Sequence, residues 1–306
     1  MSAHEFAGGG MSTKTIGMIG IGQLGLSIAA NLIQRGFAVV GYRRTNHTEF
    51  ERLGGTVSAC PAEVVRSASM ILLCLPDEAA QLHVLDSADG VLATLRPGQI
   101  VIELATYERE FKVQQMRRLE GRGGRIIEAE VTGSPSMVAQ RKAALYLGGS
   151  ADLIAECQHV LDAIADTQFH IGELGSAVSM KLVANYLLAI HTLAAAEAMN
   201  LGARLGLDPQ RLIDAIRPSA GGSAMFSVRA PMMAARNFWP APGPFKTLDK
   251  YIRMALGMTD RLGFAAPLFG TAASYFDRAI ELGMQEEDIS AVIKLIEADS
   301  VDCRAH

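Results

Sequence analysis

The sequence predicts an α/β protein, with a doubly wound sheet followed by an all-α C-terminal domain. From residue 15 to about residue 169, short apolar runs alternate with longer helical patterns. After residue 172 the strand patterns stop, and apolar residues recur at helical spacing. The 306 residues are enough for two domains. We expect a disordered lead-in over residues 1–12, the sheet domain over 13–171 and the helical domain over 172–306.

The elements of the first domain follow from the spacing of its apolar residues. Short apolar runs predict strands over residues 15–19, 38–42, 70–75, 100–104, 125–129 and 144–147. Amphipathic patterns predict helices over residues 24–35, 61–66, 79–85, 108–121 and 151–164. Because the connections are long and strands alternate with helices, we expect parallel strands joined by crossover helices that cover both faces of the sheet.

The second domain is predicted to be entirely helical. Its apolar patterns predict helices over residues 178–205, 209–216, 247–262, 268–282 and 289–298. The first of these is expected to join the two domains. Residues 217–244 contain two adjacent glycines and five prolines, so this interval is expected to be partly irregular.

Composition and charge exclude several classes of protein. The 28 basic and 32 acidic residues include no long basic run, so we expect no nucleic-acid partner. The four cysteines lie far apart without a Cys-x-x-Cys pair, which argues against a zinc knuckle or a disulfide framework, and we expect no metal. The apolar stretch 182–199 is interrupted by Asn185, His191 and Glu197, so we expect a helix packed inside protein rather than in a membrane. The N-terminus lacks the pattern of a signal peptide, and we expect a cytoplasmic protein.

A Gly-x-Gly-x-x-Gly motif follows the first predicted strand and opens the first predicted helix. The motif spans residues 20–25, and the residues in it that we expect to bind the cofactor are Gly20, Gly22, Gln23, Leu24 and Gly25. In this context the first glycine permits a tight turn, the second lets the backbone approach a pyrophosphate and the third lets helix and strand pack closely. The N–H groups at the helix start bind the anion. The motif predicts a Rossmann-type dinucleotide site, and the alternative is a purely structural glycine turn.

The second strand leads into Arg43, Arg44 and Thr45, where an NAD-specific site usually has an acidic residue for the ribose hydroxyls. Two guanidinium groups and a hydroxyl suit a 2′-phosphate, because arginine offers paired donors to phosphate oxygens. We therefore expect NADP(H) to be preferred over NAD(H), with Arg44 as the main phosphate ligand. The alternative is that both arginines are merely solvated at the end of a strand.

The order and spacing of the motifs in this chain resemble those of the β-hydroxyacid dehydrogenase family. This family includes 3-hydroxyisobutyrate dehydrogenase, glyoxylate and succinic semialdehyde reductases and, more distantly, 6-phosphogluconate dehydrogenase. The motifs that carry the resemblance are the glycine turn, Leu75–Asp77, Glu128–Ser134, Gly172–Gly175, Lys181 with Asn185, and Lys250. The resemblance covers nearly the whole chain. It implies an NAD(P)-dependent 3-hydroxyacid dehydrogenase or reductase that acts on a CH–OH group.

Lys181 and Asn185 match the catalytic lysine and its companion on the long helix of the family. Their spacing of four residues places both side chains on one helix face. Hydride transfer at a carbinol carbon requires a proton to move on its oxygen, and a partly desolvated lysine with a lowered pKa is suited to that step. Asn185 is expected to orient the substrate. Without the resemblance, Lys181 would read as a lysine capping the exposed start of a helix.

The resemblance implies that Thr132, Gly133 and Ser134 bind a substrate carboxylate. The family usually reads Asp-Ala-Pro-Val-Ser-Gly-Gly over this segment, and here Ser134 replaces the second glycine and Pro135 follows it. Proline has no N–H and restricts the backbone, so the reach of the turn is altered. The substrate therefore stays open, and the alternative is a tight connection without a chemical role.

Further cofactor contacts are implied by the resemblance. Leu75 and Pro76 are expected on the nicotinamide side of the cofactor, and Thr106 near its ribose, although Ala105 replaces the usual serine beside it. Lys250 matches a family lysine near the cofactor. The aspartate that normally follows this lysine is replaced by Tyr251.

We therefore expect an NADPH-linked enzyme that interconverts a small aldehyde or keto acid and a hydroxy acid, with Lys181 as general acid or base. Two alternatives remain at this point. One is an imine reductase-like enzyme, although imine reductases typically lack the lysine, and the other is a non-catalytic NADPH-binding module. The long alanine-rich helix suits close packing, so we expect a homodimer or homotetramer, with a small carboxylate-bearing substrate as the other partner.

Overall fold

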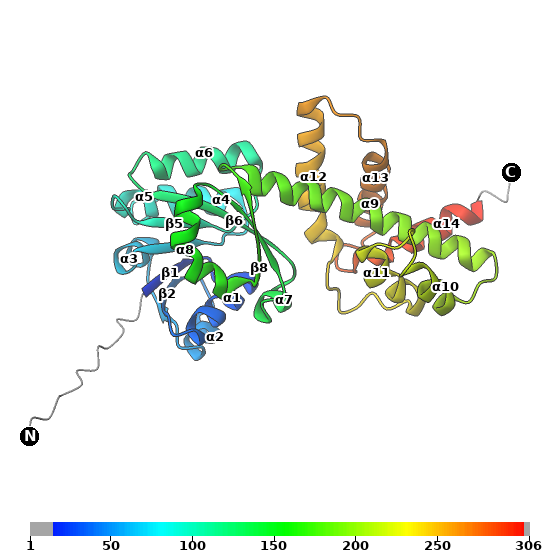
Figure 1. Ribbon diagram of the computed structural model, residues 1–306, viewed down its shortest axis with the longest axis horizontal. Helices are drawn as coiled ribbons and strands as arrows, with labels where there is room; N and C mark the ends of the chain where they lie inside the picture. Colours follow the sequence, from blue (N-terminus) through cyan, green and yellow to red (C-terminus); the bar gives the residue numbers. More distant parts are fainter. Residues whose placement is uncertain (1–14, 303–306) are drawn as a thin grey trace, which may run out of the picture. The chain divides into compact units, whose positions relative to one another are not determined.

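The computed structural model describes residues 15–302, so the expected lead-in over residues 1–12 lies outside the described residues. The chain divides by its contacts into two compact units, with the division between Ser179 and Met180 (Figure 1). The first unit contains the sheet and the second is helical. A single long helix, α9 (Ser176–Arg204), starts in the first unit and continues into the second. The predicted fold class is confirmed.

The first unit is built on one eight-stranded sheet with the order β3-β2-β1-β4-β5-β6-β7-β8. The strands are β1 (Thr15–Ile19), β2 (Ala38–Tyr42), β3 (Thr56–Val57), β4 (Met70–Leu73), β5 (Ile100–Glu103), β6 (Arg125–Thr132), β7 (Ala144–Gly148) and β8 (Thr167–Gly172). The strand order reverses at β1, which pairs in parallel with both β2 and β4. Such a reversal opens a crevice at the carboxyl ends of the two central strands, where ligands of open α/β sheets bind.

One pairing departs from the expected parallel sheet: β6 and β7 are antiparallel. Only residues 133–143 connect them, and they hold the short helix α7 (Pro135–Ala139). A parallel pair needs a crossover of about a dozen residues or more, so this connection is too short to return the chain to the other end of the sheet. Strands β3 and β8 were not expected. β3 has two residues, and β8 is a largely exposed edge strand whose sequence lacks a clear apolar pattern.

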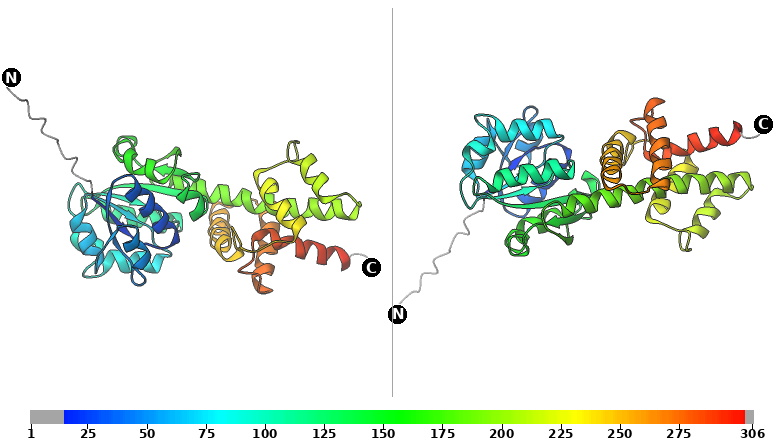
Figure 2. Two further views of the ribbon diagram at one scale, coloured as in Figure 1. Left: turned by 90° about the horizontal axis from the view of Figure 1, so that it is seen from below. Right: turned by 90° about the horizontal axis from the view of Figure 1, so that it is seen from above.

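Helices cover both faces of the sheet (Figure 2). One buried cluster joins a sheet face to α1 (Gln23–Gln34), α7 and α8 (Ala151–Ile164). A second joins the other face to α3 (Pro61–Ser67), α4 (Glu78–Asp86) and α6 (Arg109–Glu120). The two remaining short helices are α2 (Thr48–Arg52) and α5 (Val91–Thr94). Because both faces are covered, β4 is buried at every position, which explains its continuous apolar run.

The second unit packs its helices around one apolar cluster. After α9 they are α10 (Pro209–Ile216), α11 (Ala224–Ala235), α12 (Phe245–Leu262), α13 (Pro267–Glu281), the 3₁₀ helix η1 (Ile289–Val292) and α14 (Ile293–Asp302). Helix α11 forms inside the interval expected to be partly irregular and contains Pro231. The Ser223 side chain caps it by accepting from Phe226 N at 3.0 Å, and Phe226, Ala230 and Met233 bury one face. Capping and burial there outweigh the hydrogen bond that a proline removes.

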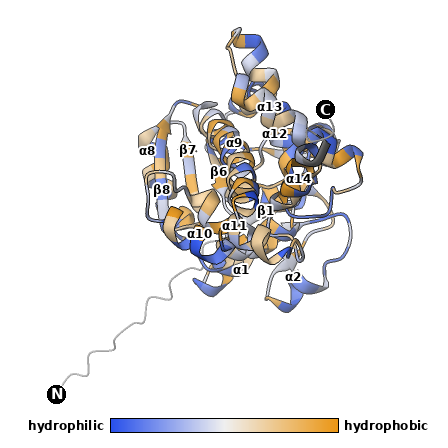
Figure 3. Ribbon diagram, turned by 90° about the vertical axis from the view of Figure 1, so that its right-hand side faces the viewer, coloured by the Kyte–Doolittle hydropathy of each residue, from blue (hydrophilic) through white to orange (hydrophobic). Residues whose placement is uncertain are grey.

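Helix α9 is long and apolar enough to cross a membrane by length and composition alone. Figure 3 shows hydrophobic residues along it. Ala189, Ala196 and Met199 lie in the buried cluster of the second unit, as in the core helix of a globular protein. Other positions of the helix, such as Leu187 and Leu201, are exposed, so the helix is buried on one face rather than all round.

Candidate active site

The glycine turn lies at the point where the strand order reverses. Gly20 follows β1 with a φ of 100°, a conformation that glycine adopts without strain. A Cβ at this position would lie 2.1 Å from the Cys74 carbonyl oxygen, directly after β4. Gly20 N also donates to Tyr42 O at 3.1 Å, at the end of β2. The turn is therefore fitted between the carboxyl ends of three strands, and no larger residue can replace its first glycine.

The other two glycines also have the geometry of a dinucleotide turn. A Cβ on Gly25 would lie 2.1 Å from the carbonyl oxygen of Gly20, so helix α1 packs onto the turn only without a side chain there. Gly22 is exposed, and nothing lies within 4 Å of where its Cβ would be. The first turn of α1 has no acidic side chain, and its leading N–H groups belong to Gln23 and Leu24. An open, uncharged backbone cradle at a helix N-terminus fits a pyrophosphate.

The loop after β2 carries the arginines expected at a 2′-phosphate. Arg43 is half-buried, and its Nη1 donates to the carbonyl oxygen of Asn46 at 3.4 Å. The ring of His47 makes a further hydrogen bond of 2.5 Å with the carbonyl oxygen of Arg43. Arg44 and Thr45 are exposed. Because β2 ends beside the glycine turn, both guanidinium groups emerge at the same edge of the sheet as the predicted pyrophosphate site.

The other residues of the first unit that are expected to bind the nucleotide follow strands β4 and β5. Leu75, half-buried, and Pro76, exposed, come directly after β4. Thr106 follows β5 and is only 5% exposed. Its hydroxyl donates to Glu130 Oε2 at 2.6 Å and so points into the protein interior. Thr106 is thereby connected to a buried network of charged side chains.

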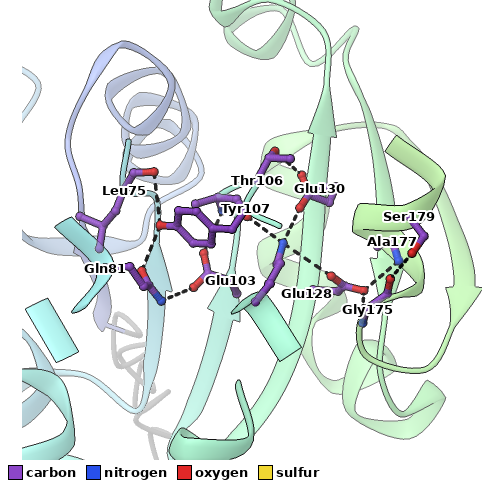
Figure 4. A network of polar contacts seen from close by, with 12 residues as sticks. Leu75, Gln81, Glu103, Thr106, Tyr107, Glu128, Glu130, Gly175, Ala177 and Ser179 are labelled. Carbon is purple, nitrogen blue, oxygen red and sulfur yellow. Dashed lines mark hydrogen bonds and ion pairs between the residues drawn. The ribbon is translucent and has the colours of Figure 1, made fainter. Parts of the chain in front are cut away.

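Figure 4 shows this network with its carboxylates Glu103, Glu128 and Glu130. Its central cation is Lys112 of α6, which is 1% exposed. Its ammonium group forms an ion pair with Glu130, lies 3.5 Å from Glu128 Oε2 and donates to the carbonyl oxygen of Ala105 at 2.8 Å. Glu128 and Glu130 are alternate residues of β6, so their side chains project from one face of the sheet. The lysine thus joins β6 to the loop that carries Thr106.

Glu128 extends the network to the start of α9. Its Oε1 accepts from Gly175 N at 2.7 Å and from Ala177 N at 2.8 Å. A carboxylate at a helix N-terminus satisfies backbone donors that have no partner within the helix and complements the helix dipole. Because Lys181 lies one turn after Ala177 on the same helix, the network fixes both the Thr106 loop and the start of the helix that carries Lys181.

The network holds three buried carboxylates and one buried ammonium group. Burial alone would lower the pKa of Lys112, but Glu130, Glu128 and Glu103 together raise it above its ordinary value, so the lysine is charged. Glu103, the last residue of β5, accepts from Gln81 Nε2 at 2.7 Å and from Ala105 N at 2.9 Å. Burial raises the pKa of Glu103 from 4.5 to about 7, although Lys112 opposes the rise. Glu103 is therefore the carboxyl group that takes up a proton near neutral pH.

This pKa predicts a pH-dependent cost of folding. A carboxyl group with a raised pKa binds its proton more tightly in the folded state, so stability is lost as the pH rises from 4.5 to about 7. We expect the unfolding free energy of Glu103→Gln, relative to that of the unsubstituted protein, to rise by about 2 to 3 kcal/mol when the pH is raised from about 5 to about 8. Urea unfolding at both pH values measures this difference. A constant difference between the two proteins would show that Glu103 does not titrate in this range.

The predicted substrate turn follows β6. Thr132 is the last residue of β6, and Gly133 after it has a φ of 141°. The Ser134 hydroxyl caps α7, because it accepts from Met137 N at 3.3 Å and shares a hydrogen bond of 2.8 Å with the Ser136 hydroxyl. Pro135 occupies the first position of α7, where its missing N–H costs little. The departures at Ser134 and Pro135 therefore form a helix start, and Ser134 is already engaged in capping.

In the second unit Lys181 and Asn185 lie on α9, and Lys250 and Tyr251 lie on α12. Lys181 is only 8% exposed, unlike a lysine that caps the exposed start of a helix. Its Nζ lies 5.1 Å from the centroid of the Tyr251 ring. Asn185, Lys250 and Tyr251 are half-buried. A buried cation beside an aromatic ring, with an amide one turn further along the same helix, is suited to proton exchange with a bound substrate.

The sequence pattern did not single out Lys112 or Glu103. A signal existed in β6, where Glu128 and Glu130 interrupt an otherwise apolar strand at alternate positions. Two buried carboxylates on one face of a sheet require a cation. Lys112 lies four residues before Met116 and seven before Leu119, so it shares the buried face of α6 with them, although its charge argues against burial. Among residues 15–302 no group of three or more His, Cys, Asp or Glu side chains is placed to hold a metal ion.

Comparisons with known proteins match both units. Residues 15–172 match the family model of the NAD-binding domain of 6-phosphogluconate dehydrogenase, and residues 175–296 match that of the NAD-binding region of NADP-dependent 3-hydroxyisobutyrate dehydrogenase. L-threonate dehydrogenase of Cupriavidus necator is 33% identical over 92% of this chain and 96% of its own. Glyoxylate/succinic semialdehyde reductase 1 of Arabidopsis thaliana is 29% identical over 92% of this chain and 98% of its own.

A solved structure has the same fold across both units. The structure of 3-hydroxyisobutyrate dehydrogenase of Mycobacterium tuberculosis, which includes L-serine, is similar with a TM-score of 0.86. It is 25% identical and covers 93% of this chain and 99% of its own.

Proposed function

Because the chain belongs to the β-hydroxyacid dehydrogenase family, we propose that it interconverts a small carboxylate-bearing aldehyde or keto acid and the corresponding hydroxy acid. As a member of this family it is an NAD(P)-dependent oxidoreductase that acts on the CH–OH group of hydroxy acids. We propose further that NADP(H) is preferred over NAD(H) and that Lys181 is the general acid and base. The observation that carries this proposal is the burial of Lys181, a cation 8% exposed, with Asn185 one turn further along α9.

In this mechanism the bound nucleotide supplies or accepts the hydride. During reduction the Lys181 ammonium group donates a proton to the carbonyl oxygen, and during oxidation the neutral amine accepts the proton of the hydroxyl group. Asn185 offers both an amide donor and a carbonyl acceptor, with which it orients the reacting oxygen. The positive charge of Lys181 also stabilises the negative charge that develops on this oxygen.

The proposed substrate class has support from the relatives and from the turn after β6. The related proteins are named for glyoxylate, succinic semialdehyde and L-threonate, which are small carboxylate-bearing compounds. Thr132 and the backbone of Gly133 offer donors to such a carboxylate. Ser134 is less available, because its hydroxyl caps α7. Turnover of a panel of carboxylate-bearing aldehydes and hydroxy acids with NADP(H) tests this proposal.

The proposed cofactor preference predicts a selective effect of Arg44. Arg44 is exposed beside the glycine turn, whereas the Arg43 guanidinium group already binds Asn46 O. Since a charge-assisted hydrogen bond contributes about 1.5 to 3 kcal/mol, we expect Arg44→Ala to weaken NADPH binding by about 10-fold to 100-fold. NADH lacks the 2′-phosphate, so its dissociation constant should change by less than about twofold. Fluorescence titration of both nucleotides measures the two constants.

Arg43→Ala is the matched comparison and should weaken NADPH binding less than Arg44→Ala. Equal losses for NADPH and NADH in Arg44→Ala would mean that the arginine does not recognise the 2′-phosphate. NADH binding to the unsubstituted protein at least as tightly as NADPH would overturn the preference itself.

We also propose a cytoplasmic homodimer or homotetramer without a nucleic-acid or membrane partner. The exposed apolar side chains of Leu187 and Leu201 on α9 support a subunit contact, because exposed apolar patches commonly mark interfaces. Light scattering of the purified protein measures the number of subunits.

A further inference from the structure

Tyr251 and Lys181 form a close pair inside the second unit. Lys181 Nζ lies over the Tyr251 ring, 5.1 Å from its centroid, which is within the range of a cation–π interaction. The lysine comes from α9 and the tyrosine from α12, so two helices that are far apart in the sequence bring the groups together. The half-buried ring packs against the apolar cluster of this unit. The core therefore holds the ring that the ammonium group faces.

We propose that Tyr251 is a positioning residue for Lys181, whose ring face holds the ammonium group in the orientation from which it exchanges a proton with the substrate. This inference rests on the acid/base role proposed above for Lys181. A lysine side chain has four carbons of flexible stem, so an ammonium group without a fixed contact samples many orientations. The attraction to a ring face strengthens where water is excluded, and Lys181 is 8% exposed.

A ring at this position has a different electrostatic effect from a carboxylate. An aspartate, which the resemblance leads one to expect after Lys250, would place a negative charge near Lys181. Tyr251 has no carboxylate and presents a ring face to the ammonium group instead. The ring therefore does not neutralise the positive charge of Lys181, which acts on a carboxylate-bearing substrate and on the oxygen that becomes negative during reduction. Tyr251 thus contacts the lysine without adding a negative charge beside it.

The test compares Tyr251→Phe, which keeps the ring, with Tyr251→Leu, which removes it. We expect Tyr251→Leu to lower kcat by about tenfold or more, since the fixed contact with the ammonium group is lost. Tyr251→Phe should stay within about threefold of the unsubstituted enzyme, because phenylalanine has a similar ring face. The NADPH dissociation constant should change by less than about twofold in both variants, because positioning of the lysine acts on turnover.

Because the ring also contacts the core, its removal affects the packing of the second unit as well as the position of Lys181. The melting temperature of each variant measures the effect on packing. Tyr251→Met, a flexible side chain of similar length without a ring, replaces the leucine variant if that variant does not fold. A ring-free variant with unimpaired kcat would overturn the proposal. So would a Tyr251→Phe variant impaired as much as Tyr251→Leu, since the hydroxyl group and not the ring face would then matter.

A double variant distinguishes this inference from the proposed function. In a Lys181→Met background, Tyr251→Leu should change the residual rate by less than about twofold, because no ammonium group remains to be positioned. A full additional loss in that background would contradict positioning through Lys181. If Lys181→Met alone keeps its turnover, the acid/base proposal fails. If Lys181→Met is inactive while Tyr251→Leu is fully active, only the role of Tyr251 fails.

Discussion

Lys181→Met is expected to lower kcat by about a thousandfold, because a positioned general acid or base contributes about 10²-fold to 10⁴-fold to the rate. Methionine keeps the length and apolar stem of lysine and removes the ammonium group. The Lys181 side chain on α9 is buried, so water is poorly placed to replace the ammonium group as proton donor. Steady-state turnover with the best substrate of the carboxylate panel measures the loss. NADPH binding, measured by fluorescence, should change by less than about twofold, because the loss falls on the chemical step.

Lys246→Met is the matched control for this variant. Lys246 lies on α12, is exposed and pairs with Glu286 at 2.6 Å, so its replacement removes a lysine without touching the proposed site. It should keep the kcat of the unsubstituted enzyme. A Lys181→Met enzyme with the same turnover as Lys246→Met would show that the proton comes from another group.

Lys112→Met is expected to destabilise the first unit by about 3 to 5 kcal/mol, the cost of removing one partner from a buried ion pair. The ammonium group is 1% exposed and faces Glu128 and Glu130, which are both fully buried. Without it, two buried carboxylates lose their counter-charge. The urea dependence of unfolding near neutral pH measures the change in free energy.

A second substitution tests the origin of this loss. Adding Glu130→Gln to Lys112→Met removes one of the unpaired charges, so the double variant should recover part of the lost stability. Lys246→Met, at an exposed ion pair, should change stability by less than about 0.5 kcal/mol. A Lys112→Met variant within about 1 kcal/mol of the unsubstituted protein would mean that the carboxylates take up protons at little cost.

The parts of the fold that follow local patterns could be predicted from the sequence. The glycine motif, the apolar strand before it and the amphipathic helix after it are contiguous, so their spacing alone predicts a turn at Gly20 and close packing at Gly25. Strand β1 and helix α8 have the predicted bounds. Strand β7 was predicted but its antiparallel direction was not, because direction depends on the length of a connection and not on the strand itself.

The buried charge network could not be predicted, because its partners are distant in the sequence. Glu128 caps α9 through Gly175 and Ala177, nearly fifty residues later, and a helix N-cap is usually sought among adjacent residues. Lys112 is one of several charged residues of α6, and its charge argues against burial although it lies on the same helix face as Met116 and Leu119. Only the tertiary structure turns it inward. The pairing of Lys181 with Tyr251 is equally non-local, because it depends on how α9 packs against α12.

The most direct test of the proposed function is the consumption of NADPH by the unsubstituted protein in the presence of small aldehydes. The proposal predicts turnover with at least one carboxylate-bearing aldehyde, and a higher kcat/KM for it than for an aldehyde of the same length without the carboxylate. Tight binding of NADPH without its consumption by any member of the panel, and without NADP⁺ reduction by the corresponding hydroxy acids, would contradict it.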